Sequence, residues 1–300
     1  MRIAKLSDLF VELKGRPRKR IIVVNAVDEH TIEAVSKAVD KGIVEGILTG
    51  NPERIAATCQ NLEIDAEKFT IEPAATEDEA AIKAVALISE GKADLMMKGL
   101  ISTDKFIKAL LNKDYGLLPP KGVLSHVAVM EIQDYHKLLI VSDVAIIPYP
   151  DLAQKITMTG YLIRTAIALG IVNPKVALIA ATEQVLASIP ACTEAAIISK
   201  MAVRGQISGG IVDGPMALDI ALDRESAMIK KIESPVAGDA DCLLFPNIDA
   251  GNVFYKMATK LCKSNQAAIV AGAKVPVVLS SRGDSMETKL YSIALATLLT

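Results

Sequence analysis

The sequence predicts an α/β protein, and three observations support this fold class. Short apolar runs alternate with longer segments in which apolar residues recur at helical spacing, a pattern typical of strands and helices in turn. Hydrophobic residues make up 51% of the chain but aromatic residues only 4%, so the core is built from small aliphatic side chains. The 300 residues suffice for two domains of ordinary size or for one large domain.

The first part of the chain predicts an amphipathic helix and a basic loop within residues 1–20, then four strands with helices between them. Asn51 and Pro52 predict a helix start, because Asn caps helix N-termini and Pro suits the first helical position. A second helix is predicted over 76–93. The predicted strands begin at Arg20, Gly42, Lys68 and Asp94.

The pattern changes at Gly122. Two apolar runs, 122–132 and 137–147, are joined by a short polar segment, which predicts an antiparallel hairpin. The hairpin is the expected crossing point between domains. Strands and helices then alternate again, with helices from Asp151, Thr193 and Pro215, strands at 175–182, 205–214, 241–247, 267–272 and 275–281, and a closing helix over 286–299.

Composition excludes several classes of function. The net charge of −2 provides no global basic field for nucleic acid. The N-terminus lacks the apolar segment of a secretory signal, and no apolar run is long enough to span a bilayer. The four cysteines are scattered singly, so we expect reduced, buried thiols rather than disulfides or metal ligands. We expect a cytoplasmic protein without nucleic-acid or membrane partners and without a metal.

Ligands of α/β sheets bind at the carboxyl ends of the strands, so polar residues that follow strands are the candidate site. The first cluster is Ser280 to Asp284, in which Arg282 suits phosphate and Gly283 permits an unusual turn before a helix N-terminus. A structural alternative is that Asp284 caps the helix and Glu287 completes a capping box.

The second cluster follows the strand at 241–247. Its polar residues are Asn247, Gly251, Asn252 and Lys256, and the predicted helix after Gly251 offers its N-terminus and a lysine to a phosphate group. The alternative is that Asn252 only caps this helix.

The remaining candidates are weaker. Asp213, Gly214 and Pro215 form a predicted turn from strand to helix, which Pro215 explains structurally as the first helical residue. Lys98 follows a predicted strand at a turn that lacks the spacing of a Walker loop.

Ser125 and His126 lie in the first predicted hairpin strand, and Ser142 and Asp143 lie in the second. An antiparallel pairing would allow these residues to be neighbours, but no nucleophile elbow accompanies them. We therefore favour a structural or substrate-shaping role over a hydrolase triad. His30 and His136 are interpreted as ordinary surface residues.

Taken together, the segments around these clusters resemble the phosphate acetyl/butyryltransferase family. The resemblance rests on MKGLISTDKF, LSHVAVME, PKVALIAATEQV, RGQISGGIVDGPMALDIAL, VAGDADCLLFPNIDAGNVFYK and VPVVLSSRGDSMETKLYSIALA. It covers most of the chain and is strongest from Lys175 to Ala296. The chain length, the SRGDS turn and the SHVAV strand resemble the butyryl-transferring members more than the acetyl-transferring ones.

The resemblance implies reversible acyl transfer between butyryl-CoA and inorganic phosphate, with acetyl transfer as the alternative. Coenzyme A would be a substrate, with no tightly bound cofactor. By analogy Ser281 would meet the thiol or carbonyl and Arg282 the phosphate. The acetyltransferases place an Asp base seven residues beyond that serine, where this chain has Thr288, so Asp284, Glu287 or Asp213 would have to serve.

The implied fold has two three-layer α/β/α domains with mixed, mostly parallel sheets, similar to isocitrate and isopropylmalate dehydrogenases. We expect the first domain at 1–138 plus 284–300 and the second at 139–283, with the active site in the cleft between them, in a homodimer or larger oligomer. Two further alternatives are a non-catalytic module that binds coenzyme A or a phosphorylated metabolite, and an oxidoreductase. The oxidoreductase alternative would require a dinucleotide-binding motif, which this sequence lacks.

Overall fold

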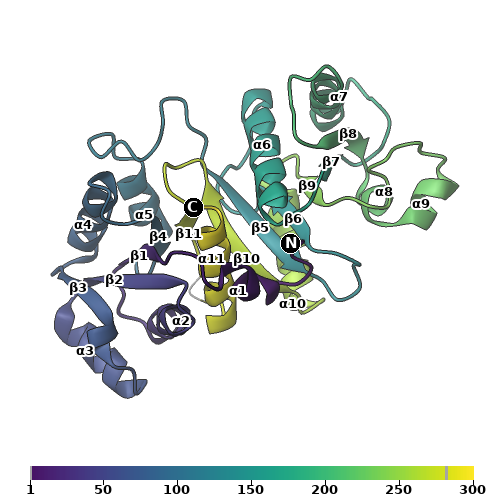
Figure 1. The fold of residues 1–300 in the computed structure, drawn as a ribbon. Coiled ribbons are helices and arrows are strands. Elements are labelled where there is room, and N and C mark those ends of the chain that lie inside the picture. Colours follow the sequence, from purple (N-terminus) through teal and green to yellow (C-terminus); the bar gives the residue numbers. More distant parts are fainter. Residues whose placement is uncertain (1, 281–282) are drawn as a thin grey trace. The chain divides into compact units, whose positions relative to one another are not determined.

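The computed structural model describes residues 2–280 and 283–300. Helices and strands alternate along most of it, and the described sheets are mostly parallel, so the predicted fold class is confirmed (Figure 1). The chain divides into two compact units. The hairpin unit comprises residues 2–6 and 123–266, and the terminal unit comprises residues 7–122 and 267–300 without the two undescribed positions.

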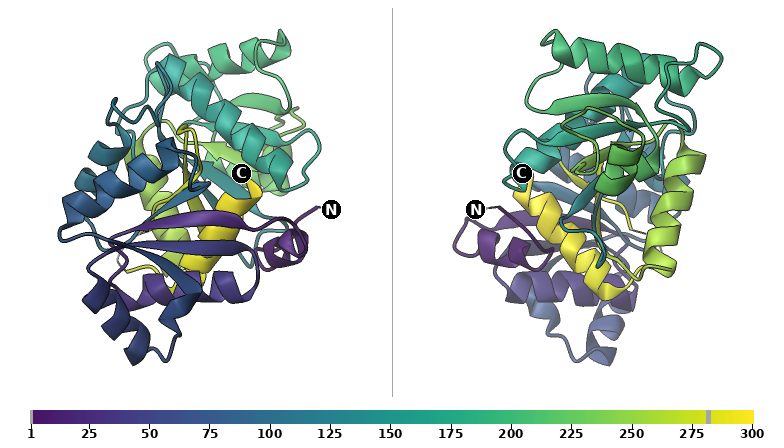
Figure 2. Two further views of the ribbon diagram at one scale, coloured as in Figure 1. Left: turned by 60° about the vertical axis from the view of Figure 1, so that its left-hand side comes forward. Right: turned by 90° about the vertical axis from the view of Figure 1, so that its right-hand side faces the viewer.

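The strand order of the terminal unit is β3-β2-β1-β4-β11-β10, and of the strand pairs in its described residues β10–β11 is antiparallel and the others are parallel. Figure 2 shows α4 and α5 on one face of this sheet and α2 and α11 on the other. The elements are α1 (Asp8–Leu13), β1 (Lys19–Val24), α2 (Glu29–Asp40), β2 (Val44–Gly50), α3 (Pro52–Asn61), β3 (Phe69–Pro73), α4 (Glu77–Ser89), β4 (Leu95–Lys98), α5 (Thr103–Leu110), β10 (Asn265–Ala271), β11 (Val277–Val278) and α11 (Met286–Leu298).

Local sequence explains why these helices start where they do. Asn51 accepts a hydrogen bond from the backbone N–H of Arg54, and Pro52 is the first residue of α3, as the sequence predicted. Thr76 caps α4 in the same way. The buried residues of β1 and β4 are apolar except for Lys98, the last residue of β4, and this buried centre of the sheet supports the polar turns at the strand ends.

The strand order of the hairpin unit is β5-β6-β9-β7-β8. The predicted hairpin is confirmed, because β5 and β6 pair antiparallel, whereas the other strand pairs are parallel. Helix α6 packs along most of this sheet and α7 packs on β8. The elements are β5 (Ser125–Glu131), β6 (Leu139–Ser142), α6 (Leu152–Ala168), β7 (Lys175–Ile179), α7 (Pro190–Val203), β8 (Ile211–Met216), α8 (Leu218–Leu222), α9 (Arg224–Ile229), β9 (Cys242–Leu244) and α10 (Ile248–Lys260).

The division between the units lies elsewhere than we expected. It falls at 122/123 and 266/267 rather than at 138/139 and 283/284. The reason is that the hydrogen-bonded hairpin keeps both of its strands in one unit, whereas β10 and β11 pair with each other before α11. Among the described residues, no helix is both long enough and apolar enough to cross a membrane.

Candidate active site

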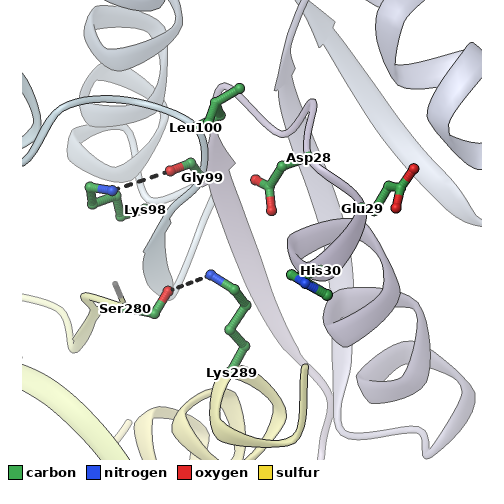
Figure 3. Close-up of a pocket in the computed structure, with 8 residues that line it drawn as sticks. All are labelled: Asp28, Glu29, His30, Lys98, Gly99, Leu100, Ser280 and Lys289. Atoms are coloured by element: carbon green, nitrogen blue, oxygen red, sulfur yellow. Dashed lines mark hydrogen bonds between the residues drawn. The ribbon is translucent and has the colours of Figure 1, made fainter. Parts of the chain in front are cut away.

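The parallel strands β1, β4 and β11 of the terminal unit end at the same edge of the sheet, and helix α2 begins beside them. A cavity of about 280 Å³ lies at this edge (Figure 3). Among the described residues its lining is mostly polar or charged, and Leu100 is the one large apolar side chain. The lining residues are Asp28, Glu29, His30, Lys98, Gly99, Leu100, Ser280 and Lys289.

Two buried lysines reach this cavity from different elements. Lys98 ends β4 and is 4% exposed, and Lys289 lies in the first turns of α11 and is 3% exposed. The Lys289 amino group donates a hydrogen bond to Ser280 Oγ at 2.9 Å, and that of Lys98 donates to the Gly99 carbonyl oxygen at 3.4 Å (Figure 3).

The electrostatic surroundings of Lys289 act in opposite directions. Burial lowers the pKa of its amino group below the ordinary lysine value, whereas the nearby negative charges of Asp28 and Asp284 act to raise it. Asp28 caps α2 by accepting a hydrogen bond from the backbone N–H of Thr31 at 3.0 Å. His30 is exposed but lines the cavity, so our interpretation of it as an ordinary surface residue is incomplete.

The turn after β4 is held in place by close backbone packing. A Cβ atom on Gly99 would lie 2.5 Å from the Val24 carbonyl oxygen and 2.6 Å from that of Asn25, so only glycine fits. The Asn25 side-chain amide donates to the Leu100 carbonyl oxygen at 2.6 Å. These contacts fix the wall of the cavity from which Lys98 extends.

The loop before α11 carries the residues that the sequence analysis ranked first. Ser281 and Arg282 lie outside the described residues. Helix α11 is capped by Ser285, whose hydroxyl accepts from the Thr288 backbone N–H at 3.2 Å, so the alternative that Asp284 caps this helix is wrong. Both residues are good caps, and the chain uses the one nearer the helix.

The other members of that loop have different environments. Glu287 is exposed in the first turn of α11, and Gly283 is exposed in a turn with open space around it. Asp284 is half-buried, and its charge is close enough to Lys289 to act on the pKa of that lysine.

In the hairpin unit, the carboxylate of Asp143 organises the candidate residues of β5 and β6. Ser125 Oγ donates to Asp143 Oδ2 at 2.9 Å and lies 2.8 Å from Ser142 Oγ. The backbone N–H of His126 donates to the same Oδ2 at 3.0 Å, and those of Ala145 and Ile146 donate to Oδ1. The carboxylate is therefore occupied by four donors.

The geometry is not that of a hydrolase triad. Asp143 binds the backbone of His126 rather than its ring, and Ser125 bonds Asp143 directly. The His126 ring instead meets the Tyr255 ring edge-on, with 6.3 Å between their centroids. The structural or substrate-shaping role of these residues stays a prediction.

Helix α10 begins earlier than we expected. Its cap is Asn247, which accepts from the Ala250 backbone N–H at 3.0 Å, so Gly251 and Asn252 lie inside the helix and Asn252 does not cap it. Position 251 requires glycine because a Cβ atom there would lie only 2.1 Å from the Asp143 carbonyl oxygen. Asn252 donates to the Val144 carbonyl oxygen at 2.8 Å, and Lys256 is exposed.

The predicted turn at Asp213–Pro215 is wrong. Strand β8 continues through these residues, and α8 begins only at Leu218. Proline is tolerated because β8 is the edge strand of this unit, where a missing N–H leaves no partner unpaired. Asp213 Oδ1 accepts from Ser199 Oγ and from the Gly214 backbone N–H.

The structure brings together only part of the predicted set within each unit. Lys98 shares the cavity with Ser280 in the terminal unit, and Asp143 joins Ser125, His126 and Gly251 in the hairpin unit. Sequence reasoning missed Lys289 and Asp28. The available signal for Lys289 was its position one turn before Ile293, on the buried face of an otherwise apolar helix.

Three of the four cysteines are buried, but Cys262 is exposed, which differs from our expectation. Across residues 2–280 and 283–300, no group of three or more His, Cys, Asp or Glu side chains is arranged to hold a metal ion.

Comparison with known proteins decides the family. A family model described as phosphate acetyl/butaryl transferase matches residues 74–297. The chain belongs to this family.

The relatives agree over nearly the full length. The chain is 44% identical over 296 residues to the phosphate butyryltransferase of Clostridium acetobutylicum, covering 99% of this chain and 98% of the relative. It is 43% identical to the phosphate acetyltransferase of Thermotoga maritima, covering 95% and 97%. A crystal structure of a branched-chain phosphotransacylase from Enterococcus faecalis matches with a TM-score of 0.82 and 29% identity, covering 94% and 98%.

Proposed function

We propose that this protein transfers a short-chain acyl group reversibly between coenzyme A and inorganic phosphate, with butyryl as the preferred group. The observation that carries the proposal is the polar cavity at the carboxyl ends of β1, β4 and β11, with two buried amino groups. A cavity of this lining suits a small anion. Membership of the phosphate acetyl/butyryl transferase family supports the same chemistry.

The proposed reaction balances without a covalent enzyme intermediate. A phosphate oxygen attacks the thioester carbonyl carbon, the carbon–sulfur bond breaks, and coenzyme A leaves as a thiolate that takes up a proton. In reverse, the thiol loses its proton to a base, attacks the acyl phosphate, and phosphate leaves. Placing the two anionic reactants in line and stabilising the carbonyl oxygen charge would supply most of the rate.

The proposed roles follow the family resemblance. Ser281 would contact the thiol or carbonyl, and Arg282 would bind phosphate. Asp284 is the best candidate for the base, because Ser285 and not Asp284 caps α11, whereas Asp213 is hydrogen-bonded to Ser199. Replacing Arg282 with Ala is expected to reduce turnover by orders of magnitude while the protein remains folded.

The proposed physiological setting rests on smaller observations. We propose a reducing, cytoplasmic compartment, which is supported by four free cysteines. We also propose a homodimer or larger oligomer. An exposed apolar stripe along α10 and its C-cap residue supports this, because Val253, Met257 and Leu261 recur at four-residue spacing. Coenzyme A enters as a substrate and not as a bound cofactor.

The deciding experiment is phosphate-dependent release of free thiol from butyryl-, isobutyryl- and acetyl-CoA in parallel. Release that requires phosphate and is fastest with butyryl-CoA is the expected result. A higher rate with acetyl-CoA would replace butyryl by acetyl transfer. Release without phosphate would indicate a thioesterase, and no release from the folded protein would favour a binding module.

A further inference from the structure

The cavity of the terminal unit has a size and lining that select among the reactants. Its volume of about 280 Å³ is roughly nine times the 30 Å³ that one water molecule occupies in the liquid. It therefore has room for a phosphate ion with a few waters. Because Leu100 is the one large apolar side chain among the described lining residues, these residues offer little contact to an acyl chain.

The charged residues of the cavity differ in how deeply they are buried. The two lysines are almost fully buried, whereas Glu29 and His30 at the start of α2 are exposed. In Figure 3 the Lys289 amino group extends from α11 to a position between Ser280 and Asp28. The Asp28 carboxylate already accepts the Thr31 backbone N–H, so its charge is partly offset by the helix N-terminus.

Burying the amino groups of two lysines is costly. Burying an ammonium group carries a desolvation penalty that an apolar residue of similar length would avoid. Lys289 occupies the buried face of α11, whose neighbouring buried positions include Leu290 and Ile293. An anion that enters the cavity would offset this penalty through charge-assisted hydrogen bonds.

We propose that the amino groups of Lys98 and Lys289 bind the oxygens of inorganic phosphate in this cavity, and that Lys289 determines much of the affinity for phosphate. The inference rests on the proposed function, since it names the residues that hold one of its two substrates. Ser280 orients the Lys289 amino group through their hydrogen bond. The turn that Gly99 fixes holds the backbone of Lys98 in place at the wall of the cavity.

The test compares phosphate binding and acyl-CoA kinetics in matched variants. Lys289→Met removes the charge at nearly constant length, Lys289→Arg retains it, and Lys108→Met is the control at an exposed lysine on α5. Binding of inorganic phosphate is measured by isothermal titration calorimetry, and the KM values for phosphate and butyryl-CoA are measured by thiol release. Circular dichroism checks that each variant is folded.

Lys289→Met is expected to weaken phosphate binding, and to raise the KM for phosphate, by at least about tenfold, which corresponds to about 1.4 kcal/mol. The KM for butyryl-CoA should change by less than about twofold, because the lost charge acts on the other substrate. Lys289→Arg should retain most of the affinity, and Lys108→Met should match the wild type.

Wild-type phosphate affinity in folded Lys289→Met would overturn the inference, as would an equal rise in both KM values. If Lys289→Met does not fold, Lys98→Met carries the same test with the same expected direction. The proposed function is judged separately by the wild type. Wild-type thiol release without any effect of Lys289→Met on phosphate refutes only the inference, whereas Lys289-dependent phosphate binding without thiol release refutes only the proposed reaction.

Discussion

Replacing Gly251 with alanine tests the packing between α10 and the turn after β6. In an isolated helix this change would be favourable by about 1 kcal/mol, because alanine has the higher helix propensity. In this protein the new Cβ atom would lie 2.1 Å from the Asp143 carbonyl oxygen, whereas real Cβ atoms keep at least 3.0 Å. The helix and the turn would therefore have to separate by nearly an ångström.

The expected magnitude follows from three contributions. Forced overpacking costs about 1–3 kcal/mol. The separation also weakens the hydrogen bond of 2.8 Å from Asn252 to the Val144 carbonyl oxygen, which contributes about 1 kcal/mol. The gain in helix propensity offsets about 1 kcal/mol of this cost. We expect the free energy of unfolding to fall by about 1–3 kcal/mol.

The assay is urea unfolding followed by circular dichroism, with Gly160→Ala as the matched control. Gly160 lies within α6 of the same unit, and a Cβ atom there would meet nothing within 4 Å. Gly160→Ala is expected to raise the stability by up to about 1 kcal/mol. The reasoning is refuted if Gly251→Ala stabilises the protein as Gly160→Ala does.

Three further predictions concern charge and burial. Burial acts to raise the pKa of Asp239, but hydrogen bonds from Lys137, Lys175 and His136 outweigh it and hold that pKa well below the ordinary value. The stability that Asp239 contributes is fully present above about pH 4 and is lost as the pH falls through its folded-state pKa. The difference in free energy of unfolding between wild type and Asp239→Asn should therefore shrink in acid. A difference that stays constant with pH would contradict this. Asp143→Asn places an amide donor against backbone N–H groups and should cost at least about 2 kcal/mol, more than Ser142→Ala in the same unfolding assay. Cys262 alone among the four cysteines should react rapidly with a thiol reagent in the native state, since the other three are buried; a second fast thiol would show that this burial is wrong.

The alternation of strands and helices was predictable because its determinants are local. The hairpin, the cap at Asn51 and the start of α6 after Asp151 each depend on residues within a few positions of one another. The same local rules failed where two neighbours were equally suitable. Asp284 and Ser285 are both good caps, and only the position of the helix decides between them.

Other features depend on contacts that sequence spacing does not contain. Gly251 was interpreted as the start of a helix, but a glycine is required there because the carbonyl oxygen of Asp143, distant in sequence, leaves no room for a Cβ atom. Pro215 indicated a helix start, but it lies in a strand at the sheet edge. Lys289 was not singled out from the sequence, because only the packing of α11 in the terminal unit buries it and places it in the same cavity as Lys98. The parts of the site that were missed are those fixed by tertiary packing.

The central claim is that the acyl group moves from coenzyme A to inorganic phosphate. The most direct test is to incubate the protein with butyryl-CoA and phosphate and to quantify butyryl phosphate by ³¹P NMR alongside free thiol. Our account predicts that the two products form in equal amounts and that added coenzyme A reverses the reaction. Free thiol together with butyrate and no acyl phosphate would contradict it.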